Sequence, residues 1–179
     1  MEFTVGEAVV FGDSGATIVR DITVQTNGDR TWTKLVLGFP FDSADPDLVT
    51  PLIDSGYVAP LSEVLGPGGV PAVLEVLAGQ VPDRDPDTWG ADTYVTMIGG
   101  ITAEAYLDDM PAVLDARQVA EVVRNLTARQ YRQELSVGES QVLGNARLVL
   151  VSEIALGAGM TRSQAETAID EALAGHRPS

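Results

Sequence analysis

The stretch ATIVRDITVQTNGDRTWTKLVLGF, residues 16–39, contains two runs in which apolar and polar residues alternate. Such alternation is typical of strands with one buried face. Between the runs, the triplet Asn27–Asp29 is a strong signal for a tight hairpin turn. We therefore predict a β-hairpin. The apolar residues expected to share a face in each strand are Ile18, Ile22 and Val24 in the first and Leu35, Leu37 and Phe39 in the second.

The pattern around this hairpin predicts a β module followed by an α module. Residues 5–11 and 48–53 supply further short strands, and several short strands in about fifty residues favour a small barrel. Beyond Gly56 the apolar period becomes helical. Helices are expected over 61–66, 70–79, 103–114, 116–135, 139–156 and 163–174. We predict an α+β fold, with a barrel in residues 1–55 and an all-α domain in residues 56–179.

Polar residues mark three of the helix starts. Asp115 is a plausible N-cap for the helix that follows it. Ser136 with Glu139, and Thr161 with Gln164, have the spacing of capping boxes, in which each side chain accepts a hydrogen bond from the other residue's backbone N–H.

The composition limits the chemistry that the chain can perform. Of 179 residues, 45% are apolar and 21% charged, which is typical of a globular protein. The absence of cysteine excludes disulfides and thiolate sites. The single histidine, His176, lies near the end and is expected to be a disordered tail residue. No stretch has the length and apolarity of a membrane span, and residues 1–3 do not open a signal peptide, so we expect a cytoplasmic protein. We also expect it to be a monomer.

The net charge of −15 disfavours nucleic acid and anionic membranes and favours basic partners. Lys34 is the only lysine, so cationic contacts fall to arginine.

Two motifs resemble a catalytic site or a metal site but lack a residue that such a site needs. The Gly12–Gly15 segment, GDSG, resembles the surroundings of a catalytic serine, but that chemistry needs a nearby histidine. The acids of DRDPD begin like a calcium loop, yet Thr88 stands where glycine is required. We therefore expect no enzyme, no cofactor and no metal.

Two features remain open. Trp89 lies among acids and turn formers in DRDPDTWGAD, residues 83–92, either as a core residue at the end of a loop or as a ring presented to a partner. On the helix expected over 116–135, Val119, Val122, Val123 and Leu126 share one face. Arg117, Arg124 and Arg132 lie opposite, with Arg129 beside them. This is either an ordinary solvated face or a cationic stripe for phosphates or an acidic protein.

In order and spacing, a set of short segments resembles the CarD family of bacterial transcription regulators, which bind RNA polymerase. The segments are FTVGEAVVF (3–11), GYV (56–58), VLEVL (73–77), DPDTW (85–89), VAEVVRNL (119–126), LSVGE (135–139), ARLVLVSEIAL (146–156) and AETAIDEAL (165–173).

The resemblance implies a Tudor-like barrel that docks on the polymerase β subunit and helices that meet promoter DNA. There a tryptophan, matched by Trp89, wedges into the minor groove at the upstream edge of the bubble and stabilises the open complex. Arg147 and the Arg117, Arg124 and Arg132 stripe would face the DNA. Gln25 and Val49 match the positions that face polymerase.

The chain departs from the family pattern at both contact surfaces. Gly90, Ala91 and Asp92 replace a basic cluster after the tryptophan, and SQVLGN (140–145) replaces basic residues before the last long helix. Gln25 and Val49 stand where the family has arginines. The sequence thus favours a non-enzymatic regulator with weak, polymerase-dependent DNA contact. The alternative is an acidic paralogue that has lost DNA binding and acts as a protein-interaction module.

Overall fold

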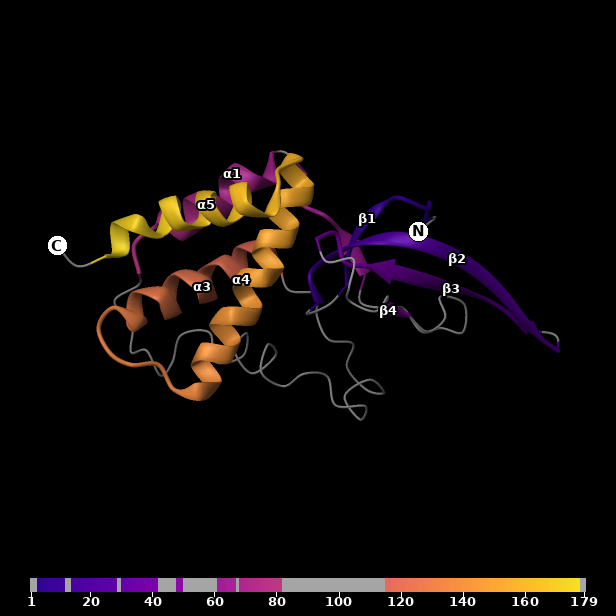
Figure 1. The fold of residues 1–179 in the computed structure, drawn as a ribbon, viewed down its shortest axis with the longest axis horizontal. Helices are drawn as coiled ribbons and strands as arrows, with labels where there is room; N and C mark the ends of the chain where they lie inside the picture. Colours follow the sequence, from indigo (N-terminus) through magenta and orange to yellow (C-terminus); the bar gives the residue numbers. More distant parts are fainter. Residues whose placement is uncertain are drawn as a thin grey trace.

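The computed structural model describes residues 3–11, 14–28, 30–41, 48–49, 61–66, 68–81 and 115–177. An N-terminal sheet is followed by helices, which confirms the α+β class. Figure 1 shows the sheet at one end of the molecule and the helices at the other, with the end of α5 far from the sheet.

The sheet contains β1 (Ala8–Phe11), β2 (Ala16–Asn27), β3 (Arg30–Gly38), β4 (Leu48–Val49) and β5 (Leu61–Glu63). They form one five-stranded sheet in the order β4-β3-β2-β1-β5, and each neighbouring pair is antiparallel. The pairing of Asn27 with Arg30 leaves a two-residue turn, in which Gly28 has a φ of 63°. A left-handed backbone of this kind is what the Asn-Gly signal predicts, so the hairpin is confirmed.

A bulge in β2 changes which of its residues face the core. The β2–β3 register shifts between Val19 and Asp21. One extra residue in a strand reverses the alternation beyond it. As a result, Val19 before the bulge and Ile22 after it belong to the same apolar cluster. Val24, two residues beyond Ile22 and toward the hairpin turn, is 61% exposed. The prediction that Ile18 shares a face with Ile22 is therefore wrong.

Residues 61–66 were expected to be helical, and this expectation is also wrong. Leu61–Glu63 form β5, which pairs with β1. A six-residue helix has too few internal hydrogen bonds to offset its nucleation cost, whereas the edge of β1 offers ready partners. The sheet consequently extends beyond residue 55, the predicted domain boundary.

The described helices are α1 (Gly69–Ala78), α3 (Ala116–Gln130), α4 (Val137–Ala158) and α5 (Arg162–Leu173), and a short 3-10 helix, Ala174–His176, follows α5. All four helices were predicted, with the end of α3 five residues too late. The three predicted N-caps are capping boxes: Asp115 with Gln118, Ser136 with Glu139, and Thr161 with Gln164. The helix expected over 103–114 lies outside the described residues.

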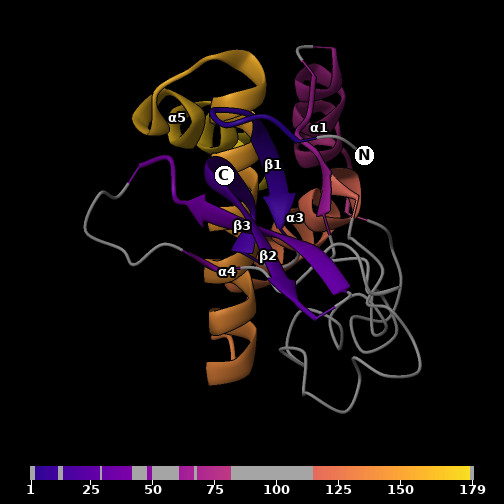
Figure 2. The same cartoon turned by 90° about the vertical axis from the view of Figure 1, so that its right-hand side faces the viewer.

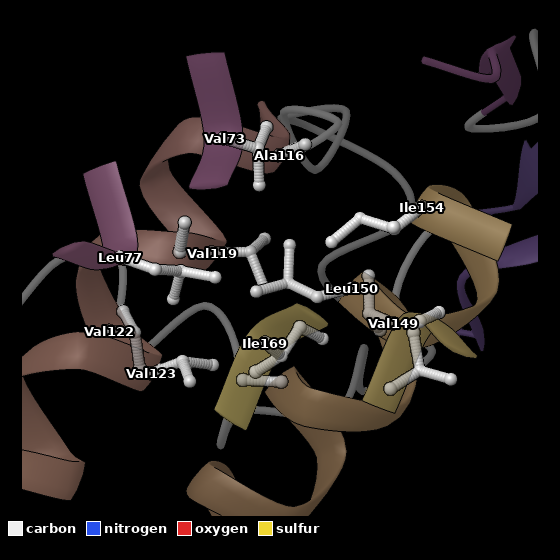
Figure 3. Packing of buried hydrophobic residues seen from close by; sticks show 14 of the residues in the cluster. Val73, Leu77, Ala116, Val119, Val122, Val123, Val149, Leu150, Ile154 and Ile169 are labelled. Carbon is white, nitrogen blue, oxygen red and sulfur yellow. The ribbon is translucent and has the colours of Figure 1, made fainter. Parts of the chain in front are cut away.

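The helices enclose their own apolar core. Val119, Val122, Val123 and Leu126 of α3 are buried in it, as the helical pattern predicts. Figure 3 shows Leu150 and Ile154 of α4 meeting residues from α1, α3 and α5. A second cluster, built on Val9, Val19, Leu35 and Leu37, fills the sheet.

Helix α4 lies between the sheet and the other helices. Every residue from Val149 to Ala155 is buried, so this part of α4 is covered on all sides. A helix surrounded in this way needs packing partners all round. The other helices cover one side and the sheet covers the opposite side (Figures 1 and 2).

No single described helix is both long and apolar enough to cross a bilayer. Helices α4 and α5 meet that criterion only as a pair, bent by 113° at the break between them.

Candidate nucleic-acid interface

Trp89 and its acidic neighbours, residues 83–92, lie outside the described residues. The choice between a buried and a presented ring therefore stays a prediction. The remaining candidate residues lie on α3, on α4 and in the sheet.

Arg124 does not lie on a solvent-facing stripe, contrary to the prediction from the helical pattern. It is only 7% exposed. Its Nη1 donates to the Val76 carbonyl oxygen at 3.2 Å, and its Nε donates to Asn125 Oδ1 at 3.0 Å. The reason is tertiary: α1 packs against α3, and the guanidinium meets the last turn of α1 at the Val76 carbonyl. Burial lowers the pKa of Arg124, and the charge of Glu121 opposes that change.

His176 also has a structural position, which corrects the expectation of a disordered tail. Its Nε2 lies 2.8 Å from the Leu77 carbonyl oxygen, at hydrogen-bond distance, and the side chain is half-buried. Leu77 and Val76 belong to the last turn of α1, where carbonyls lack partners within the helix. Arg124 and His176 thus both contact carbonyl oxygens at the C-terminal end of α1.

Two further arginines are held in ion pairs. Arg147 Nη2 lies 2.6 Å from Asp170 Oδ1 on α5, with both side chains partly exposed. Arg129 Nε lies 3.1 Å from Glu139 Oε1 at the start of α4. The hydrogen bond from the Ser136 backbone N–H lowers the pKa of Glu139, and the charge of Arg129 acts in the same direction. Arg147, the cation matched to the family pattern, is therefore close to a carboxylate.

Arg117 and Arg132 are exposed. Arg117 lies in the first turn of α3 and Arg132 follows the end of that helix. At 1.5 Å per residue, their backbones are separated by about 22 Å along the helix direction. Among the described residues on and directly after α3, the predicted stripe therefore reduces to two exposed cations, one at each end of the helix.

The two predicted polymerase contacts lie in the same sheet but not side by side. Gln25 is exposed on β2 and pairs in register with Trp32 of β3. Val49 lies on the edge strand β4 and pairs with Val36 of β3. Along β3 the two positions are four residues, or about 13 Å, apart.

Within the described ranges, no three acidic or histidine side chains form a group that could hold a metal ion. One buried carboxyl stands out instead. Glu153 on α4 is 4% exposed, and burial together with the charge of Asp115 raises its pKa to about 7. The sequence does carry a signal for it, because Ser152 and Glu153 interrupt the apolar run LVLVSEIAL.

Residues 112–170 match the family model described as CarD, C-terminal domain. The matched span includes all of α3 and α4 and most of α5. These helices carry the Arg117, Arg124 and Arg147 positions considered above. The match identifies a CarD C-terminal domain in residues 112–170 and supports membership of the CarD family.

Proposed function

We propose that this chain is a CarD-like transcription regulator that binds RNA polymerase and contacts promoter DNA only when polymerase holds it there. The observation that carries the proposal is the CarD C-terminal domain in residues 112–170. In this proposal the sheet, including Gln25 and Val49, faces the polymerase β subunit. The α3 and α4 helices and Trp89 face DNA near the upstream edge of the bubble.

The electrostatics of α3 and α4 support weak intrinsic DNA binding. Arg124 is buried, and Arg129 and Arg147 are paired with carboxylates. Arg117 and Arg132 remain exposed. Each phosphate neutralised on duplex DNA adds about 0.9 to the slope of log affinity against log salt. Two contacts would give a slope of only about 2, in a protein with a net charge of −15.

Tethering to polymerase offsets this weakness. A tethered module meets its site at an effective concentration of about a millimolar, so it needs little affinity of its own. The segment around Trp89 also depends on tethering to reach DNA, because residues 82–114 contain seven acidic residues and one arginine and would be repelled by phosphates.

The direct test is retention on the immobilised polymerase β lobe. The chain should be retained at micromolar concentrations, and Val49→Asp should reduce retention because it places a charge on the edge strand. Glu171→Ala, an exposed change on α5, serves as the control and should leave retention unchanged. Failure of the unmodified chain to bind would contradict the proposal.

The buried and paired arginines favour a second candidate, a protein-interaction module that binds polymerase without contacting DNA. Trp89→Ala separates the two candidates in a promoter-opening assay. Loss of opening with intact lobe binding supports the DNA-contacting regulator, whereas unchanged opening supports the interaction module.

Releasing Arg147 from its ion pair should strengthen DNA binding. In Asp170→Asn the guanidinium is free to meet a phosphate, so the salt slope should rise by about 0.9. Stability should change by less than about 1 kcal/mol, because the pair is partly exposed. Fluorescence anisotropy with a labelled duplex over a salt series measures the slope.

The matched control is Glu166→Gln. It makes the same change of net charge on the same helix but breaks the pair with Arg162 instead. Equal effects of the two variants would show that net charge acts alone and that Arg147 has no special role.

A further inference from the structure

The start of β2 meets the middle of α4 through one buried hydroxyl. The Ala16 N–H donates to Ser152 Oγ at 2.9 Å, and the Ser152 hydroxyl donates to the Val149 carbonyl oxygen at 2.7 Å. Ala16 is fully buried and Ser152 is 8% exposed. Ser152 thus links the backbone of the sheet module (β1 to β5) to the backbone of the helical module (α1, α3, α4 and α5) through two hydrogen bonds of one largely buried hydroxyl.

Gly15, directly before this contact, has no space for a side chain. Its φ of 77° is a left-handed conformation. A Cβ added there would lie 2.6 Å from Ser152 Oγ and 3.1 Å from Val149 Cα. The turn therefore lies against the α4 backbone as closely as glycine permits.

A second close contact, near the end of α4, holds the segment that leads from β5 of the sheet to α1. Leu65, between β5 and α1, packs against the helical core. Its carbonyl oxygen lies where a Cβ on Gly157 would be, and that Cβ would be 3.1 Å from the Leu65 carbonyl carbon. A side chain at Gly157 would push this segment away from α4.

The two contacts restrain different motions. Ser152 and Gly157 are five residues apart, so they are separated by about 7.5 Å along the helix and by about 140° around it. A contact at one point leaves a module free to pivot about it. Two contacts at different heights and on different sides of α4 prevent both pivoting and sliding.

We propose that Ser152 and Gly157 are positioning residues that fix the sheet module and the helical module in a single orientation. Modules joined by a modest interface move relative to one another by default, so a fixed orientation needs such specific contacts. The consequence rests on the proposed function: docking of the sheet on polymerase then sets where the helices meet the promoter, without a separate adjustment of the two parts.

Residual dipolar couplings of the full chain test the orientation without any partner. In the unmodified protein, couplings from both modules should fit one alignment tensor. Ser152→Ala removes the linking hydroxyl, and Gly157→Ala displaces Leu65. In each variant the modules should need two tensors or a changed relative orientation. Ser152→Ala is the milder change and keeps the test available if Gly157→Ala does not fold.

The chain provides matched controls. Gly144→Ala lies on the same helix in open space and controls for Gly157→Ala. Gly6→Ala is the control for Gly15→Ala. Both glycines have a positive φ, but a Cβ at Gly6 would have no neighbour within 4 Å. The difference between the two variants therefore measures the contact of Gly15 with α4. Both controls should keep the single tensor. Two tensors in the unmodified protein, or one unchanged tensor in Ser152→Ala and Gly157→Ala, would overturn the proposal.

The link to transcription needs a separate measurement. Ser152→Ala should still bind the polymerase β lobe but should reduce promoter opening by about fivefold or more. A changed orientation with unchanged opening refutes the functional consequence. A chain that fits one tensor but does not bind the lobe refutes the proposed function and leaves the positioning role intact.

Discussion

Replacement of Arg124 by methionine should lower the free energy of unfolding by about 2–4 kcal/mol, although the helical pattern alone would place this residue on the surface. The guanidinium is 7% exposed and donates to the Val76 carbonyl and to Asn125. Methionine keeps much of the apolar stem but donates no hydrogen bond. Asn125 Oδ1 then loses this charged donor, and the last turn of α1 loses a cation near its negative end. Chemical denaturation followed by circular dichroism measures the change.

Arg117→Met is the control for this prediction. It removes the same charge from the same helix, but Arg117 is exposed and its stability change should stay within about 0.5 kcal/mol. The pattern should reverse for DNA held by polymerase, where Arg117→Met weakens the contact and Arg124→Met acts only through stability. Equal stability effects would mean that Arg124 is not part of the junction between α1 and α3.

Replacement of Glu153 by glutamine should stabilise the protein at alkaline pH and not at acidic pH. The pKa of Glu153 rises from 4.5 to about 7, mainly because the carboxyl is buried and secondly because Asp115 carries a like charge. The folded state therefore holds the proton more tightly than the unfolded state. This stabilisation is fully present below pH 4.5 and is lost as the pH rises through about 7.

The glutamine side chain does not titrate, so the variant keeps at high pH the stability that the unmodified protein loses when Glu153 ionises. The difference in unfolding free energy should grow over this interval and then level off. It should reach on the order of 3 kcal/mol, the free energy equivalent of a change in pKa from 4.5 to about 7. Denaturation curves at about pH 5 and about pH 8 measure it.

Glu75→Gln, an exposed change on α1, controls for the loss of one negative charge from an acidic protein. Its effect should be small at both pH values. A Glu153→Gln effect that does not vary with pH would show that the pKa of this carboxyl is not raised in the folded protein, and that packing of the amide explains the change.

Local sequence signals predicted several elements of the fold correctly. The hairpin follows from Asn27–Asp29, because the turn residues need only a permissive backbone and flanking strands of matching pattern. The capping boxes at Ser136 and Thr161 depend on residues three positions apart. The buried face of α3 follows from its apolar period.

Predictions from local sequence were wrong where a segment distant in sequence determines the surroundings of a residue. Leu61–Glu63 became a strand because β1 offered an open edge, and the bulge near Arg20 shifted the face of β2. Arg124 and His176 were assigned to solvent because the sequence does not show that α1 ends beside them. A single apolar period predicts one buried face for a helix, whereas α3 is covered on two.

By itself, the sequence determined the α+β class, the hairpin, the helix starts and the family resemblance, since each depends on residues that are close along the chain or on their order. Only the tertiary structure decided which arginines remain exposed, which carboxyl is buried, and that the backbone at Gly15 and at Leu65 lies directly against α4. These properties depend on packing between segments far apart in sequence. Whether a charge meets water or a carbonyl is set by the neighbour that the fold brings to it.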